Sequence, residues 1–229
     1  MSLIFTAGAI VLTIGAYRFA IAVRRRWAHP LTTPVLFSTA IVIAAFLAVR
    51  ADVRAYEPAK QILTFLLGPA TVALAIPLHR NRHAFRREMF AALCGLLAGI
   101  VVTMVLAIVC ARAFGLGVSL EATLAVKSAT AAIAIEIARI INGDPALAAG
   151  FVVCTGTFGA ALGPWLLDRA HVRSAIARGV AFGSIAHGIG TAQAAAESEL
   201  SGAIAGVSLG IGAVVTSVLA PVLMRLLAA

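Results

Sequence analysis

The sequence predicts an all-α protein that crosses a membrane several times, and two observations predict it: composition and the placement of charge. Of the 229 residues, 62% are hydrophobic and only 12% are charged, whereas a soluble domain carries about 25% charged residues. The mean hydropathy is +1.03. The charges gather in short stretches between long apolar segments, as in multi-pass membrane proteins. We therefore expect a single integral membrane domain over residues 1–229.

The apolar segments are long enough to give about 7–8 transmembrane helices. A helix needs about 20 apolar residues to cross the hydrocarbon core of a membrane. The connections between the segments are short, so the helices must pack against one another. The predicted segments are 3–23, 33–49, 59–78, 88–112, 119–141, 146–168, 176–197 and 201–227.

The basic loops predict the orientation of the chain in the membrane, and they do not agree with a full crossing by each of the eight segments. Basic loops of membrane proteins lie on the cytoplasmic side, which places loop 24–31 inside and the N-terminus outside. Basic loop 79–88 is also expected inside, but three simple crossings after it would put basic loop 168–178 outside. One segment therefore fails to cross or turns back. With that correction the acidic "ESE" at 197–199 lies outside and the C-terminus is cytoplasmic.

Segment 119–141 is the best candidate for the irregular element. Its halves "SLEATLAV" and "AIAIEIARII" are each too short to span, and polar "KSAT" separates them. Two half-helices joined by an unwound bridge account for this pattern, because irregular backbone inside a membrane must be buried in protein or line a cavity. Either a broken spanning helix or a re-entrant hairpin fits.

Two further breaks are predicted. In "LLGPATVALAIP" (66–77), Gly68 and Pro69 indicate a second discontinuous element or a plain proline kink. "GPATVALA" also resembles "KSATAAIA" (127–134), which makes Thr71 the counterpart of Thr130. In "FGSIAHGIGTAQAAAE" (182–197), glycines weaken the helix. We expect scaffold helices over 1–58 and a core over 59–229, with broken helices near 68–71, 127–131 and 187–191.

Lys127 is the leading candidate for a binding residue. An ammonium group deep in a membrane costs about 2.5–3.5 kcal/mol, so it usually faces a partner or a cavity. The functional interpretation is capture of an anionic substrate group, and the structural one is an ion pair with Glu136. In a continuous helix the two residues would be about 13 Å apart, so a direct pair requires a break or an intervening group.

Glu136 and His187 are candidates for proton coupling. Glu136 could instead pair with Arg139 one turn further on. His187 lies at a predicted break, where free backbone N–H groups make an anion site, or it could simply bond a neighbouring helix. Thr191 and Gln193 could line a pocket or serve as contacts between helices.

Other classes of function find no support in the residue patterns. Cys94, Cys110 and Cys154 show no metal-ligand spacing and are expected to be small core residues. No Ser/His/Asp triad, zinc-protease motif or phosphate-binding loop occurs, so we expect neither an enzyme nor a cofactor or metal site. The basic runs are interpreted as cytoplasmic loops, so no nucleic acid partner is expected.

Two stretches carry a family resemblance: "VKSATAAIAIEIARIINGDPALAAGFVVCTGTFGAALGPWLL" (126–167) and "RGVAFGSIAHGIGTAQAAAESELSGAIAGV" (178–207). They resemble the LrgB/CidB family, over about residues 60–227. That family includes bacterial membrane proteins described as antiholin-like or holin-like, and the plastidal glycolate/glycerate transporter. Val126 and Ala132 stand where the family commonly has prolines. The positions that match family motifs are Lys127, Ser128, Thr130, Glu136, His187, Gly188, Gly190 and Thr191.

The resemblance implies a multi-pass protein of the bacterial inner membrane, with a fold like that of the cation–proton antiporters and anion transporters. We predict a secondary transporter of small monocarboxylates (glycolate, glycerate, lactate or pyruvate), with proton coupling through Glu136 or His187. The alternative is a holin-like or antiholin-like factor that affects murein hydrolases and cell lysis. A dimer and a smaller LrgA/CidA-like membrane partner are expected. The predicted substrate-binding residues are Lys127, Ser128, Thr130, His187, Gly188, Gly190, Thr191, Gln193, Gly68 and Thr71.

Overall fold

The all-α prediction is confirmed by the computed structural model, which describes residues 3–27, 32, 34–73, 75–80 and 82–228. The chain forms two compact units, Met1–Ala75 and Ile76–Ala229. In the described part of the chain, four helices are long and apolar enough to cross a membrane, and shorter apolar helices accompany them. The four lie within Phe5–Arg26, Arg86–Ala113, Pro145–Arg169 and Glu199–Leu227.

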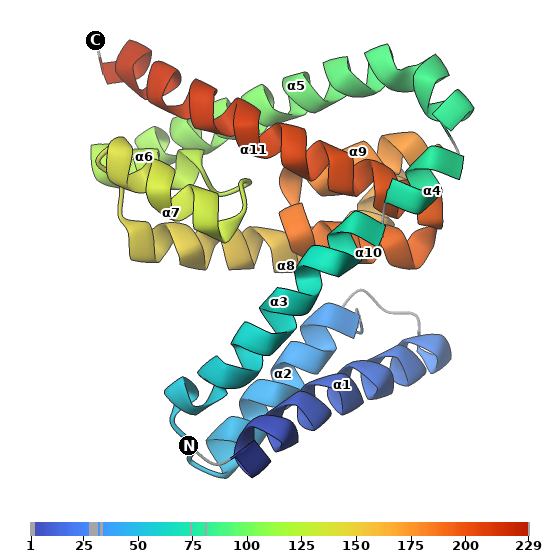
Figure 1. Ribbon diagram of the computed structural model, residues 1–229. Coiled ribbons are helices and arrows are strands. Elements are labelled where there is room, and N and C mark those ends of the chain that lie inside the picture. The colour runs from blue at the N-terminus through green and yellow to red at the C-terminus, as the bar shows by residue number, and fades with distance from the viewer. Residues whose placement is uncertain (1–2, 28–31, 33, 74, 81, 229) are drawn as a thin grey trace. The chain divides into compact units, whose positions relative to one another are not determined.

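The first unit is built on an antiparallel pair of helices, α1 (Leu3–Arg26) and α2 (Pro34–Ala48), which lie side by side in Figure 1. A short 3₁₀ turn, η2 (Val53–Tyr56), follows them. Its Tyr56 hydroxyl lies 2.9 Å from the Thr13 hydroxyl of α1. The next helix, α3 (Glu57–Ala73), completes the unit.

The break predicted near 68–71 is wrong, because α3 runs through Gly68 and Pro69 without interruption. A proline removes one backbone N–H, and a helix in a membrane protein tolerates this where local adjustments satisfy the freed carbonyl. A short helix, α4 (Ala75–Arg80), comes next in the chain.

The second unit contains three long helices, α5 (Arg82–Ala113), α8 (Pro145–Arg169) and α11 (Glu199–Ala228). Two pairs of short helices separate them along the chain. The first pair is α6 (Val118–Ala125) and α7 (Ala131–Ile140), and the second is α9 (Ala175–Ile185) and α10 (His187–Glu197).

The first short pair is a hairpin, which we call hairpin 1 (118–140). The break predicted near 127–131 is confirmed, since α6 ends at Ala125 and α7 begins at Ala131. The Thr123 hydroxyl accepts a hydrogen bond of 2.8 Å from the backbone N–H of Asp144, 21 residues away. A continuous helix would separate these residues by about 31 Å. Both ends of hairpin 1 therefore lie together, at the start of α8.

The second short pair is also a hairpin, hairpin 2 (175–197), and the prediction that 176–197 crosses the membrane as one segment is wrong. Arg178 donates hydrogen bonds of 2.6 and 3.0 Å to the carboxylate of Glu197, 19 residues away. Each of its helices has 11 residues, about 16 Å, which is half of the hydrocarbon thickness. Acidic 197–199 and the basic loop before α9 thus lie at the same end of the unit, not at opposite ends as predicted.

The turn of hairpin 2 lies at the first residue of the predicted range 187–191 and at the residue before it. The chain turns at Ala186 and His187, where His187 has a φ of 40°, and α10 then runs through Gly188 and Gly190. Glycine lowers helix stability by only about 1 kcal/mol relative to alanine. Packing therefore decides the break: His187 and Ala186 of the turn lie against Gly156 and Gly159 of α8.

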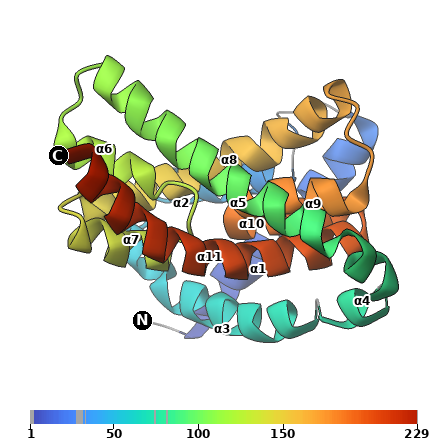
Figure 2. The same ribbon diagram turned by 90° about the horizontal axis from the view of Figure 1, so that it is seen from above.

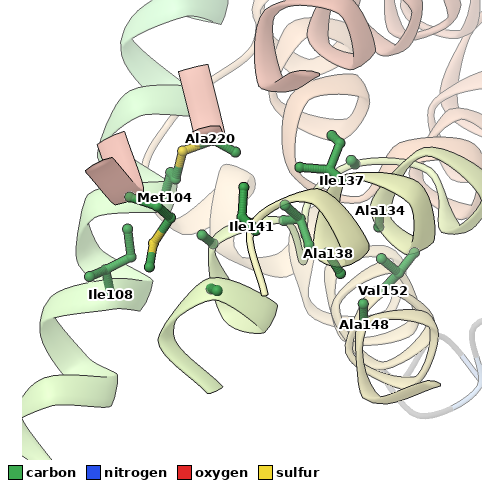
Figure 3. Close-up of a cluster of buried hydrophobic side chains, with 14 of the residues drawn as sticks. Met104, Ile108, Ala134, Ile137, Ala138, Ile141, Ala148, Val152 and Ala220 are labelled. Atoms are coloured by element: carbon green, nitrogen blue, oxygen red, sulfur yellow. The ribbon is translucent and has the colours of Figure 1, made fainter. Parts of the chain in front are cut away.

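The core of the second unit joins hairpin 1 to the long helices. Figure 3 shows buried side chains from α5, α7, α8 and α11 meeting around hairpin 1. The three cysteines are exposed, so the prediction that they are core residues is wrong. The labelled core residues are Met104, Ile108, Ala134, Ile137, Ala138, Ile141, Ala148, Val152 and Ala220.

Candidate functional site

A pocket of about 500 Å³ lies between the turns of the two hairpins and one face of α8. In Figures 1 and 2 the loop of hairpin 1 and the start of α10 both point toward the middle of α8. The walls are almost entirely apolar, and three phenylalanines contribute to them. The lining residues are Leu124, Lys127, Phe151, Cys154, Thr155, Phe158, Gly159, Leu162, Gly163, Leu166, Leu167, Ala181, Phe182, Ile185 and Ala186.

Among the residues that line this pocket, Lys127 alone carries an ammonium group. It belongs to the loop 126–130 that joins α6 to α7, and its amine donates a hydrogen bond of 3.2 Å to the Ser128 hydroxyl. In the part of the chain that the structure describes, its amine has no carboxylate within ion-pair distance. The ion pair between Lys127 and Glu136 is therefore not formed.

Glu136 pairs with Arg139 instead, at 2.9 Å, and both side chains are mostly exposed. The pairing one turn further along the helix, which was the simpler of the two interpretations, is confirmed. Glu136 is not among the residues that line the pocket. Its predicted role in proton coupling stays a prediction.

Both hairpin turns present a helix N-terminus near the pocket. Helix α7 begins after Thr130 and α10 begins after Ala186, and neither residue caps its helix with a side-chain hydrogen bond. The first N–H groups of a helix have no partner within the helix, and the end carries a partial positive charge. Of the two ends, the one at Ala186 belongs to the pocket lining, and α7 begins four residues after Lys127.

His187 holds the turn of hairpin 2 onto α8. Its imidazole is buried, and its Nε2 lies 2.7 Å from the backbone carbonyl oxygen of Val152, to which it donates. The ring packs against Gly156, and a Cβ at that position would overlap the ring. The interpretation of His187 as a histidine bonded to a neighbouring helix is confirmed.

The other predicted residues of hairpin 2 are not part of the pocket lining; all of them are buried except Gly188, which is exposed. Thr191 donates a hydrogen bond of 2.9 Å to the His187 carbonyl, and Gln193 is buried. A Cβ on Gly190 would lie 2.6 Å from the Phe182 carbonyl oxygen, whereas Gly188 has open space around it. Their substrate roles stay predictions.

Gly68 and Thr71 belong to α3 in the first unit. The surroundings of their side chains lie outside the described part of the structure. Their predicted contribution to substrate binding is thus untested. Of the ten predicted binding residues, Lys127 is the one in the pocket lining, with Ser128 as its hydrogen-bond partner.

The α8 wall of the pocket was missed by reasoning from the sequence. Phe151, Thr155 and Phe158 recur at spacings of three and four residues, which places them on one face of a helix. That signal was present in "FVVCTGTFGAALG", but the same spacing describes any packed helix face. Only the position of the hairpin turns distinguishes this face as a pocket wall.

Comparison with known proteins identifies the family. The sequence matches the LrgB-like family over residues 13–226. The chain belongs to the LrgB-like family. It is 33% identical to the protein YxaC of Bacillus subtilis over 217 residues, 95% of this chain and 94% of that protein.

Members with a functional name are also similar to the chain. It is 30% identical to the holin-like protein CidB of Staphylococcus aureus, over 95% of each chain. It is also 32% identical to the protein YwbG of Bacillus subtilis, over 94% of this chain and 96% of that protein. No solved structure matches the chain at a significant level. Several apolar helices and the membrane-protein relatives together indicate a multi-pass membrane protein.

Proposed function

We propose that this member of the LrgB-like family transports a small monocarboxylate across the membrane, with the pocket between the hairpin turns as its binding site. The observation that carries the proposal is Lys127, which lines an almost entirely apolar pocket between the two hairpin turns. An ammonium beside apolar walls favours a ligand with one negative charge and a small apolar body. A second carboxylate would be buried without a partner, which is costly.

The substrate class is the one that the family resemblance implies: glycolate, glycerate, lactate or pyruvate. Lys127 would bind the carboxylate, with the helix N-termini of α7 and α10 adding to its attraction. Thr155, on the facing wall, is the residue that would bond a substrate hydroxyl or carbonyl. Coupling to a proton through Glu136 or His187 is part of this proposal.

The names of the CidB relatives favour a second candidate function. Those relatives are called holin-like, and the name supports a role in membrane permeability and lysis at least as directly as it supports transport. In that role the protein would act by assembly, as a dimer or with a smaller LrgA/CidA-like membrane protein. The pocket would then have no substrate.

Uptake into proteoliposomes distinguishes the two candidates. The purified protein is reconstituted alone, and uptake of labelled glycolate, glycerate, lactate and pyruvate is measured. We expect saturable uptake of at least one of them. Replacement of Lys127 by Gln should reduce it by about 10- to 100-fold, the equivalent of one charge-assisted hydrogen bond.

The chain offers a matched control, because Lys60 is its other lysine. Lys60 is exposed and pairs with Glu57 at 3.2 Å in the first unit. Lys60→Gln should leave uptake unchanged. Equal uptake by wild type and Lys127→Gln would remove Lys127 from the site. No uptake of any of the four acids, together with a change in cell lysis on overexpression, would favour the holin-like function.

A further inference from the structure

We propose that the two hairpins are re-entrant elements that enter the membrane from opposite faces, so that the pocket is closed on the outer side by hairpin 1 and on the cytoplasmic side by hairpin 2. The inference concerns the second unit alone. It replaces the prediction, made from loop charge, of one irregular segment and a cytoplasmic C-terminus.

The bases of the two hairpins lie at opposite ends of α8. Asp144 caps the start of α8 and bonds Thr123 of hairpin 1. Arg178 of hairpin 2 bonds Asp168 at the end of α8, at 2.7 Å. With 25 residues, α8 is about 37 Å long, enough to cross the hydrocarbon core. One hairpin base is therefore at each membrane face.

The turns of the hairpins meet beside the middle of α8. Lys127 of hairpin 1 and Ala186 of hairpin 2 line the same pocket. His187, at the second turn, bonds the Val152 carbonyl within α8. Each hairpin thus reaches about half-way along α8 from its own end, as two short helices of half the membrane thickness must.

The end of α11 lies with the base of hairpin 1. The Arg112 guanidinium, at the end of α5, donates hydrogen bonds of 2.7 Å both to Glu121 of α6 and to the backbone carbonyl of Leu227. Helix α11 starts two residues after hairpin 2 ends. It therefore runs back along the unit and brings the C-terminus to the hairpin 1 end.

Arginine placement assigns the two ends to membrane faces. From Arg82 onward, six arginines lie at the hairpin 2 end and three at the hairpin 1 end. Basic residues mark the cytoplasmic side, so hairpin 2 enters from the cytoplasm. The hairpin 1 end and the C-terminus are then extracytoplasmic. The six are Arg82, Arg86, Arg87, Arg169, Arg173 and Arg178, and the three are Arg112, Arg139 and Arg225.

This arrangement bears on transport, and here the inference rests on the proposed function. Along the length of α8, the route to a ligand at Lys127 passes hairpin 1 from one face and hairpin 2 from the other. Movement of hairpin 1 opens the pocket to the outside, and movement of hairpin 2 opens it to the cytoplasm. Alternating access then needs no displacement of the three long helices.

Cysteine labelling in whole cells tests the topology without any assay of transport. Cys94, Cys110 and Cys154 are first replaced by Ser. Single cysteines are then introduced at Leu116 and Ala146, which flank hairpin 1, and at Arg173 and Glu199, which flank hairpin 2; all four are exposed. Val153→Cys, exposed in the middle of α8, is the control that should label from neither face.

A membrane-impermeant maleimide should label Leu116→Cys and Ala146→Cys in intact cells, and Arg173→Cys and Glu199→Cys only in inverted vesicles. A tag at the C-terminus should be accessible from outside. Labelling of 173 and 199 from opposite faces would show that 175–197 spans the membrane, and the same result for 116 and 146 would show that 118–140 does. If 173 and 199 are labelled from outside, and 116 and 146 only in inverted vesicles, both hairpins are re-entrant but the proposed orientation is wrong. The expected labelling pattern together with no uptake by the wild-type protein, which keeps Cys154 in the pocket lining, would instead overturn the proposed function.

Discussion

Hairpin 1 and hairpin 2 each cover 23 residues, but different interactions hold them. The turn of hairpin 1 is a five-residue polar loop that carries Lys127. The turn of hairpin 2 is a single strained joint at Ala186 and His187, packed onto the glycines of α8. The difference indicates that hairpin 2 is the tightly packed element and that hairpin 1 supplies the chemistry. Binding groups are often found in such loops on a rigid framework.

Substitution at the base of hairpin 2 should lower the stability of the protein more than any other change considered for the two hairpins. Arg178 and Glu197 are only 13% and 18% exposed, and loss of one partner of a buried pair costs about 3–5 kcal/mol. Arg178→Gln should therefore lower the thermal unfolding temperature in detergent strongly. Arg139→Gln removes the exposed pair with Glu136 and should cost less than about 1 kcal/mol. Equal shifts for the two variants would contradict the difference between the hairpins.

The contact between the hairpin 2 turn and α8 gives the next largest expected effect on stability. A side chain on Gly156 would overlap the His187 ring, whereas Gly150, earlier in the same helix, has open space around it. Gly156→Leu should destabilise the protein by roughly 1–3 kcal/mol, the usual cost of overpacking. Gly150→Leu should be close to neutral. Thermal unfolding of both variants measures the difference, and a neutral Gly156→Leu would mean that the turn can leave α8 freely.

The base of hairpin 1 should respond more weakly. Thr123 accepts the hydrogen bond from the Asp144 N–H and donates one of 2.7 Å to the Ser119 carbonyl. Thr123→Val removes both and leaves the Asp144 N–H without its partner, at a cost of about 1 kcal/mol or somewhat more. In α5, Thr103 bonds carbonyls of its own helix, so Thr103→Val is the control and should change stability little. A larger loss in the control would refute the role given to Thr123.

Glu136→Gln should have the smallest effect on stability, under about 0.5 kcal/mol, because the side chains of Glu136 and its partner Arg139 are both more than half exposed. The same variant tests proton coupling. If Glu136 carries the coupling proton, uptake by Glu136→Gln becomes independent of pH. A pH profile like that of wild type would assign the coupling to another group, with His187→Gln as the next variant to measure.

Sequence reasoning reached the helical class and the interruption at Lys127, because composition and a polar "KSAT" inside an apolar segment are local signals. It did not reach hairpin 2. The contact between Arg178 and Glu197 joins residues 19 positions apart, and nothing in the apolar pattern of 176–197 separates a fold-back from a crossing. The predicted break at Gly68 and Pro69 failed for a related reason, since α3 tolerates the proline.

The same limit applies to the site. Lys127 was found because a charge in an apolar segment is costly and conspicuous. For His187 the sequence left a binding role and a hydrogen bond to a neighbouring helix both open, and the bond to the Val152 carbonyl shows the second. Thr155 and the phenylalanines of α8 were missed because their spacing is that of any buried helix face.

The most direct test of the account is equilibrium binding of labelled monocarboxylates to the purified protein. We predict saturable binding of glycolate, glycerate, lactate or pyruvate to wild type and to Lys60→Met. Lys127→Met should bind about 10- to 100-fold more weakly, since it keeps the length of the side chain and removes the charge. Equal affinity of wild type and Lys127→Met would contradict the central claim that Lys127, between the two hairpin turns, binds the substrate.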